Sequence, residues 1–424
     1  MKETSRFYSS LGLLILLNAI VKPLWIFGID RQVQNVAGIE TYGTYFSILS
    51  LSFVLMFLLD WGLTNFYNRQ LSAKDQNITD RAGSFIFLKL LFTLLYTVVI
   101  FCIAFFTGIR RWDIVLYVVA IQALASMFVF FRAIITSQQW FQTDAWLSVL
   151  DKLLMILLCG TFLYFPSLFG AITIERFLLA QIGCMGLAVI TTLVILVVRK
   201  FNFSFRRLWP ERSVFKAALP FAILILLMTF HTRIDGFLLD RIIGPGEAGK
   251  YAGAYRLLDA ANMLGFLVAS FLFPYIARHK DDRKNITGVI LNVRHLLITG
   301  SVTLACVVLF LAPWIHKTLY HHDDAGSVAI LQWCLPALIG YSLVQVYGTV
   351  MTATGHIIAY SYITLICIVM NVIMNILLIP SMGAKGSCIA ALTSQVFCGI
   401  TVMWYVNQKL KINIDLRSFL IYIL

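Results

Sequence analysis

Residues Ala82–Thr107 read AGSFIFLKLLFTLLYTVVIFCIAFFT and hold one charged side chain, Lys89. About 20 apolar residues in a helix cross the hydrocarbon layer of a bilayer, so this run predicts a transmembrane helix. Similar runs recur along the whole chain, of which 60% is hydrophobic and only 12% charged. Strands of a membrane barrel are shorter and alternate apolar with polar residues, which these runs do not. The sequence therefore predicts an all-α polytopic membrane protein.

About twelve transmembrane helices are expected. The first six runs are Tyr8–Ile29, Tyr42–Trp61, Ala82–Thr107, Asp113–Thr136, Asp144–Phe165 and Ile174–Val198. The second six are Val214–Leu239, Gly249–Pro274, Ile286–Ala312, Gly326–Thr352, His356–Ile379 and Ala384–Gln408. No loop is long enough for a folded soluble domain. We expect a six-helix lobe over 1–200, a cytoplasmic basic linker over 201–213, a second six-helix lobe over 214–408 and a cytoplasmic or interfacial tail over 409–424.

The formal net charge of +13 raises the question of a nucleic-acid partner. Most lysine and arginine residues outside the spans fall on the same side as the N-terminus, which the positive-inside rule identifies as the cytoplasmic side. An N-in, C-in orientation explains the charge, and no nucleic-acid partner is expected. The eight cysteines lie within spans without a C-x-x-C pair, so no cofactor or metal site is expected. A histidine-rich outer loop matches no defined zinc spacing and is expected to be solvated: His316, His321, His322 and Asp323-Asp324.

A weak internal repeat relates the two halves of the chain. Asp30-Arg31 and the YGTY stretch Tyr42–Tyr45 correspond to Asp240-Arg241 and the YAGAY stretch Tyr251–Tyr255. Six spans separate the copies, and an even number gives both halves the same orientation in the membrane. Parallel repeats of this kind predict two lobes with the substrate site between them.

Three stretches carry a family resemblance. The first runs from Gly38 through YGTY to LDWGL at Leu59–Leu63, the second includes RID at Arg233–Asp235 and continues to Pro274, and the third runs over Asn371–Ala391. Together they resemble the polysaccharide-biosynthesis flippases, the Wzx-like branch of the multidrug/oligosaccharidyl-lipid/polysaccharide (MOP) exporter superfamily. The resemblance covers nearly the whole chain through loose patterns of Gly, Tyr, Asn and Pro.

The resemblance implies a MATE-like fold of two six-helix lobes that works by alternating access. The implied function is to flip a polyprenyl-diphosphate-linked oligosaccharide, a repeat unit of O-antigen, capsule or exopolysaccharide, to the outer leaflet of the bacterial inner membrane. The implied partners are this substrate, the bilayer and polysaccharide polymerase or glycosyltransferase machinery, and the chain is expected to be a monomer. Many relatives add one or two helices, whereas Ile414–Leu424 is too short to span and is expected to lie in the interface.

Other function classes give different sequence expectations. A lipid-II-type flippase of peptidoglycan precursors fits the charge pattern nearly as well. A MATE-type cation or drug antiporter needs interior acids, above all in the first span, and Tyr8–Ile29 holds none. A membrane glycosyltransferase or polymerase needs carboxylates for acid–base work or a substantial outer loop. The outer loops are short, and no enzyme activity is expected.

Several charged side chains lie inside the predicted spans, where each costs roughly 2.5–3.5 kcal/mol at the bilayer centre. They must reach the interface, as expected for Arg132, form pairs, or line a hydrated interior. Lys22 and Arg233, supported by Arg256, are expected to hold the diphosphate, because arginine offers phosphate two parallel donors and lysine a point charge. Structural pairing stays the alternative, as for Arg256 with Asp259 on one helix face. The substrate-binding candidates are Lys22, Arg233, Arg256, Lys152, Arg294 and Lys89.

Polar residues within the spans supply candidates for support or ion coupling. His231 precedes Arg233 by two residues and is placed to relay protons, with a packed neutral imidazole as the alternative. Asn371 and Asn375 are four residues apart and are expected to hold neighbouring helices together. The sequence does not name the energy source. The supporting and ion-coupling candidates are Asn18, Asp235, Asp259 and His231.

Overall fold

The computed structural model describes residues 2–72, 82–201, 203, 212–279, 283–320 and 325–410. These residues form helices joined by short turns, and none of them forms a strand. The all-α membrane fold expected from the apolar runs is confirmed. Most of the basic linker, the loop residues 321–324 and the tail after Leu410 lie outside the described residues.

The chain divides into two compact units. The N-terminal unit comprises Met1–Gly38 and Ile48–Leu226, and the C-terminal unit comprises Ile39–Ser47 and Leu227–Leu424. Two helices, α3 (Ile39–Val54) and α12 (Arg212–Ile242), therefore contribute residues to both units. The lobe boundaries expected from the sequence stay a prediction.

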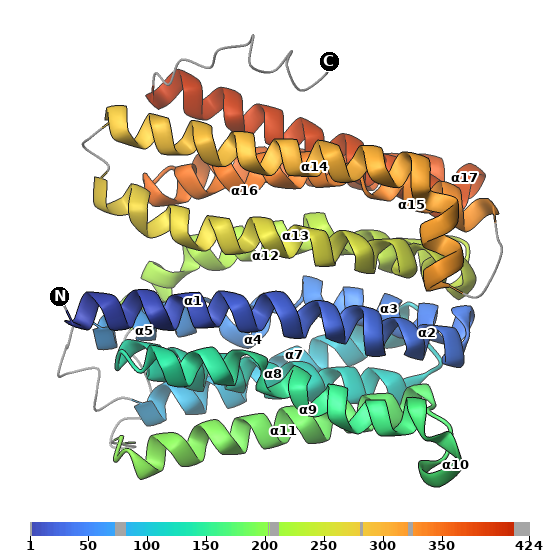
Figure 1. The fold of residues 1–424 in the computed structure, drawn as a ribbon, viewed down its shortest axis with the longest axis horizontal. Helices are drawn as coiled ribbons and strands as arrows, with labels where there is room; N and C mark the ends of the chain where they lie inside the picture. The colour runs from blue at the N-terminus through green and yellow to red at the C-terminus, as the bar shows by residue number, and fades with distance from the viewer. Residues whose placement is uncertain are drawn as a thin grey trace. The chain divides into compact units, whose positions relative to one another are not determined.

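The N-terminal unit begins with a helical segment whose winding changes at a proline. α1 (Lys2–Pro23) continues as a π-helix, η1 (Leu24–Asp30), and then as α2 (Arg31–Ala37). Pro23 has no backbone N–H to donate, which interrupts the regular ladder at this point. α1 packs against α9, and α8 packs against α5 and α11 (Figure 1). The other helices of this unit are α4 (Phe57–Asp60), α5 (Leu63–Ser72), α7 (Ala82–Phe106), α8 (Trp112–Ser137), α9 (Phe141–Tyr164), α10 (Pro166–Phe169) and α11 (Ile174–Val198).

An aromatic core joins α5, α7 and α8 within this unit. The ring centroid of Tyr67 lies 4.4 Å from that of Phe85 and 5.4 Å from that of Phe130. Leu63, Leu88 and other apolar side chains surround these rings. Since the outer faces of α7 and α8 carry large exposed apolar residues, these two helices present apolar side chains both to the core and to lipid.

The C-terminal unit contains the first half of α3 and the later helices. Gly43 and Gly249 let α3 approach α13 backbone to backbone: a Cβ on Gly43 would lie 1.9 Å from the Pro245 carbonyl oxygen, and one on Gly249 would lie 2.1 Å from that of Ile39. Small residues permit this approach between membrane helices. α16 packs against α13, α14 and α17. The helices are α13 (Pro245–His279), α14 (Arg283–Leu319), α15 (Ala325–Cys334), α16 (Ala337–Ala353) and α17 (Ile357–Leu410).

Two expected spans differ in form from single helices. The second span, Tyr42–Trp61, is divided into α3 and α4, with α5 beginning just beyond it, and the tenth is divided into α15 and α16 before Pro336. α17 contains both the eleventh and twelfth spans, which Gly383 separates with φ 58° and ψ −138°. Ten segments among the described residues are long and apolar enough to cross a membrane, with α17 counted once and the broken second span omitted. Twelve spans are consistent with these helices, and the N-in, C-in orientation stays a prediction.

Candidate functional site

The N-terminal unit places three cations near the end of α1. Lys22 lies in the last turn of α1 and is half-buried. Asp151 and Lys152 of α9 are close enough to act on Lys22 electrostatically, and so is Arg132 of α8. Within the described part of the chain, Lys22 forms no ion pair, whereas the neighbouring cations do. Lys22 is therefore an uncompensated positive charge inside a membrane span, which is costly unless water or an anion reaches it.

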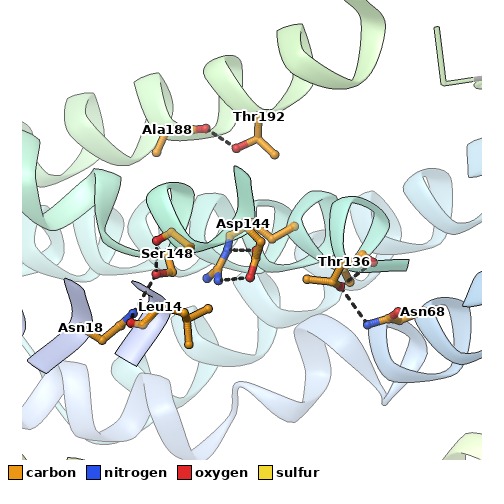
Figure 2. A network of polar contacts seen from close by, with 11 residues as sticks. Leu14, Asn18, Asn68, Thr136, Asp144, Ser148, Ala188 and Thr192 are labelled. Carbon is orange, nitrogen blue, oxygen red and sulfur yellow. Dashed lines mark hydrogen bonds and ion pairs between the residues drawn. The ribbon is translucent and has the colours of Figure 1, made fainter. Parts of the chain in front are cut away.

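The two cations beside Lys22 are held by acids and an aromatic ring. Lys152 Nζ lies 3.1 Å from Asp151 Oδ2 and 4.9 Å from the ring centroid of Trp25 in η1. Arg132 Nε donates to Asp144 Oδ1 at 2.8 Å and its Nη2 donates to Asp144 Oδ2 at 3.1 Å, drawn as dashed lines at Asp144 in Figure 2. The expectation that Arg132 only reaches for water was incomplete, because Asp144 binds both edges of its guanidinium.

Asn18 connects α1 to α9 one helical turn before Lys22. Its Nδ2 donates to Ser148 Oγ at 2.8 Å and to the carbonyl oxygen of Leu14 at 2.8 Å (Figure 2). Asn18 is buried, so both bonds are formed away from solvent. The bond to Ser148 joins α1 to α9, one helical turn from the point where Lys22 lies within electrostatic range of Asp151.

Lys89 and Arg294 are the two most deeply buried cations of the candidate set, each 1% exposed. Lys89 of α7 lies 2.6 Å from Asp60 Oδ1. Arg294 of α14 contacts His295, with 3.3 Å between Nη2 and Nε2, and also interacts with Tyr347 of α16. Both side chains are enclosed by protein, which favours a structural role over substrate binding.

Two further candidate cations of the C-terminal unit are Arg233 on α12 and Arg256 on α13. Arg233 of α12 donates to Asp259 of α13 through Nη1 at 2.9 Å and Nη2 at 3.2 Å, and lies 5.0 Å above the ring of Tyr255. The sequence spacing predicts a pair between Asp259 and Arg256, but Asp259 accepts two hydrogen bonds from Arg233 instead. Arg256 Nε instead donates to Tyr42 Oη of α3 at 3.2 Å.

A buried polar network surrounds Asp235 of α12. Asn375 Nδ2 donates to Asp235 Oδ1 at 2.8 Å and the Tyr251 hydroxyl donates to Oδ2 at 3.2 Å. Ser387 donates to Asn375 Oδ1 at 2.7 Å, and Asn375 Nδ2 also donates to Asn371 Oδ1 at 3.1 Å. Asp235 is 2% exposed, and within the described residues no cation forms an ion pair with it. A buried carboxyl with neutral partners is a candidate for binding a proton or a small cation.

His231 joins the same network from the next turn of α12. Its Nε2 lies 3.0 Å from Ser394 Oγ and its Nδ1 lies 3.4 Å from Gln395 Nε2. Asn371 Nδ2 donates to Ser394 Oγ at 3.3 Å. Hydrogen-bonding groups therefore connect His231 to Asp235 without interruption. Sequence reasoning treated Asn371 and Asn375 as packing residues and missed this connection, although their four-residue spacing placed them on one helix face.

Metal-ligating groups are sparse in the described ranges. No cluster of three or more His, Cys, Asp or Glu side chains is present there. The expectation of a solvated loop is wrong for His316, which is buried in the last turn of α14 with its ring 5.3 Å from that of Tyr320. The other residues of the outer-loop histidine group lie outside the described residues.

Comparison with known proteins identifies a matching family and a related flippase. The family model described as "Polysaccharide biosynthesis protein" matches residues 9–280. The probable low-salt glycan biosynthesis flippase Agl15 of Haloferax volcanii is 24% identical over 171 residues, which cover 39% of this chain and 35% of that protein. The match thus spans about a third of that relative.

Two solved structures share the architecture of almost the whole chain. The lipid II flippase MurJ, in an inward closed conformation, matches with a TM-score of 0.74 and 13% identity over 97% of this chain and 91% of that one. An inward-facing multidrug resistance MATE family transporter of the MOP superfamily matches with a TM-score of 0.70 and 15% identity over 94% of both chains. At these identities the likeness establishes the fold.

The fold is therefore that of MATE-like membrane transport proteins. Because the matching model covers well over half of its length, the chain belongs to the polysaccharide biosynthesis protein family. The resemblance to Wzx-like flippases of the MOP superfamily, based on the YGTY, LDWGL and RID stretches, is confirmed.

Proposed function

We propose that this protein flips a polyprenyl-diphosphate-linked oligosaccharide from the cytoplasmic to the outer leaflet by alternating access. Family membership and the flippase relative support transport across a membrane. The single observation that carries the diphosphate assignment is Lys22, a half-buried ammonium within a membrane helix that forms no ion pair in the described residues. A diphosphate supplies the negative charge that Lys22 lacks.

The candidate cations of each unit differ in the groups that hold them. In the N-terminal unit, Lys22 has no fixed acid, while Lys152 shares Asp151. In the C-terminal unit, Arg256 is half-buried and bonded to the neutral phenol of Tyr42, while Arg233 is neutralised by Asp259. Lys22 is therefore the leading diphosphate contact of the N-terminal unit. For the C-terminal unit, considered by itself, we propose the half-buried guanidinium of Arg256, and Arg233 holds the Asp259 carboxylate. Lys22 and Arg233 belong to different units. Their sharing of one central cavity stays a prediction.

Ion coupling is assigned to Asp235. The carboxyl is buried, its hydrogen-bond donors are neutral, and His231 lies at the other end of the connected network. Uptake of a proton or sodium ion at Asp235 from one side of the membrane and its release to the other couple the transport cycle to the ion gradient, which supplies the energy. Asn18 and Asp259 are supporting residues, because each holds a cation-bearing helix or side chain in place.

A lipid-II-type flippase is the second candidate, favoured by the fold match to MurJ. Both candidates use a polyprenyl diphosphate, so the sugar portion separates them. A drug antiporter has less support, because the first span holds Lys22 and no acid before Asp30. We place the protein in the bacterial inner membrane, where it delivers substrate to polysaccharide polymerase or glycosyltransferase machinery.

The test is flipping in liposomes made with the purified protein and a diphosphate-linked oligosaccharide whose sugar carries a fluorophore. Dithionite, which does not cross the bilayer, bleaches label in the outer leaflet only. Wild-type protein should raise the bleached fraction from about half to nearly all. Lys22→Met and Arg256→Gln should each slow flipping on the order of tenfold, because each loses a charge-assisted bond to the diphosphate.

Arg110→Gln is the matched control, since Arg110 is an exposed cation in the turn before α8. It should flip at the wild-type rate. Normal flipping by both Lys22→Met and Arg256→Gln contradicts the assignment of these cations. Failure of the wild type to move any diphosphate-linked glycan, O-antigen-type or lipid II, contradicts the function itself.

A further inference from the structure

The second predicted span, Tyr42–Trp61, ends at a helix break inside the N-terminal unit. α4 ends at Asp60, and the next two residues have left-handed backbone angles, with φ 47° at Trp61 and φ 75° at Gly62. A right-handed hydrogen-bond ladder cannot pass through such residues, so the backbone groups beside them lose their usual partners. In a bilayer, other protein groups must satisfy these backbone groups.

Side chains replace the missing backbone partners at this break. The Thr64 N–H donates to Asp60 Oδ2 at 3.3 Å, and the Thr64 hydroxyl donates to Asp60 Oδ1. The carbonyl oxygen of Leu59 accepts from Ser126 Oγ of α8 at 3.3 Å and from Lys89 Nζ of α7 at 3.5 Å. Side chains of α7 and α8 thus hold the break between α4 and α5.

Lys89 Nζ lies at the centre of these groups. Its distances to oxygen are 2.6 Å to Asp60 Oδ1, 2.8 Å to Ser126 Oγ and 3.5 Å to the Leu59 carbonyl. The ring of Phe130, whose centroid is 5.6 Å from Nζ, lies on another side. One ammonium therefore faces a carboxylate, a hydroxyl and a carbonyl freed by a helix break. Broken membrane helices coordinate alkali-metal ions with this same kind of oxygen set.

We infer that the oxygen atoms beside the break at Trp61–Gly62 form a monovalent-cation site. In this protein the Lys89 ammonium occupies the position that a sodium ion would take. The charge of Lys89 is balanced by Asp60, and its three donors are directed to oxygen. The site stays filled in the intact protein. Removal of the ammonium leaves an oxygen-lined space that Na⁺ can enter. This inference concerns the N-terminal unit alone and does not depend on the proposed function.

The experiment compares thermal unfolding of the full-length protein in sodium chloride and in choline chloride at equal ionic strength. All variants carry Asp235→Asn, so that the carboxyl of the C-terminal unit does not contribute a sodium response. The parent should unfold at the same temperature in both salts. Adding Lys89→Ala should lower the midpoint in choline and make it rise by several degrees, saturably, with sodium.

Two further variants separate ion binding from general stabilisation. Lys89→Met fills the space with an apolar chain and should show no sodium response. Asp60→Asn combined with Lys89→Ala removes the anionic ligand and should also show none. A Lys89→Ala variant insensitive to sodium, or a sodium response that survives Asp60→Asn, overturns the inference.

Where Lys89→Ala does not fold in choline, the yield of monodisperse protein is measured instead, after extraction in sodium and in choline. A yield restored by sodium supports the site, and an equal loss in both salts overturns it.

Discussion

Asn375 of α17 donates a hydrogen bond of 2.8 Å to Asp235 of α12, although 140 positions separate the two residues in the chain. This bond places a buried carboxyl at the end of a network that also contains His231. The network is neutral apart from Asp235 itself. Because a buried carboxylate with neutral partners is costly, binding of a proton or a cation at Asp235 would stabilise it.

Asp235→Asn should uncouple transport from ion gradients. The amide keeps the size of the carboxyl and one accepting oxygen, so the helices stay packed, but it neither binds a proton nor attracts a cation. Flipping by the wild type should accelerate under an imposed proton or sodium gradient, and flipping by the variant should not. Asp113→Asn, an exposed acid paired with Arg111, is the control and should keep the gradient response. A full gradient response in Asp235→Asn contradicts the coupling assignment.

Arg132→Met should destabilise the N-terminal unit by about 3 kcal/mol, because it leaves the buried Asp144 carboxylate without its partner. Arg132→Met combined with Asp144→Leu should recover most of this loss, since no buried charge remains. Unfolding in a series of denaturing detergent concentrations measures both. Equal stability of the single and double variants contradicts the cost attributed to the unpaired Asp144 carboxylate.

Gly43→Ala should lower stability by about 1–3 kcal/mol through steric overlap. The added methyl group would lie 1.9 Å from the Pro245 carbonyl oxygen, a backbone atom that cannot rotate away. Thermal unfolding followed by tryptophan fluorescence measures the change. Gly288→Ala in α14 is the control: no atom lies within 4 Å of its added Cβ, and alanine favours a helix by about 1 kcal/mol. A neutral Gly43→Ala is incompatible with the backbone contact between α3 and α13.

Gly383→Ala should cost about 1–3 kcal/mol, because its φ of 58° and ψ of −138° suit glycine alone. The new Cβ would also lie 2.5 Å from Glu247 Oε2, which accepts a hydrogen bond from Ala384 N at 2.8 Å. Gly355→Ala has a positive φ of 86° but open space around the Cβ, so it isolates the backbone strain. Unfolding midpoints should therefore fall further for Gly383→Ala; equal falls show that Glu247 moves aside freely.

Local features of the sequence predicted the helices well. The expected span Ile174–Val198 coincides with α11, and Ala82–Thr107 differs from α7 by one residue. Hydropathy is a property of neighbouring residues, and a helix satisfies its own backbone in lipid, so no distant contact is needed to place it. The helix break at the end of the second span was harder to predict from the sequence, because the partners of its freed backbone groups come from α7 and α8.

The candidate site was predicted in part. Composition and depth singled out Lys22, Arg233 and Asp235 as charges in need of an explanation. Spacing along one helix paired Arg256 with Asp259, whereas the bidentate partner of Asp259 is Arg233 on another helix. Such partners depend on how each helix is rotated, which spacing within one helix does not report.

From the order of its residues alone, this protein is a helical membrane transporter with basic residues at depth and the motifs of a flippase family. Tertiary structure decided which of those charges are balanced: Lys89 by Asp60, Arg132 by Asp144 and Arg233 by Asp259, with Lys22 left without an acid partner in the described chain. The reason is physical. Membrane insertion depends on the sum of residue transfer energies along a segment, whereas an ion pair requires two atoms from separate segments within about 4 Å.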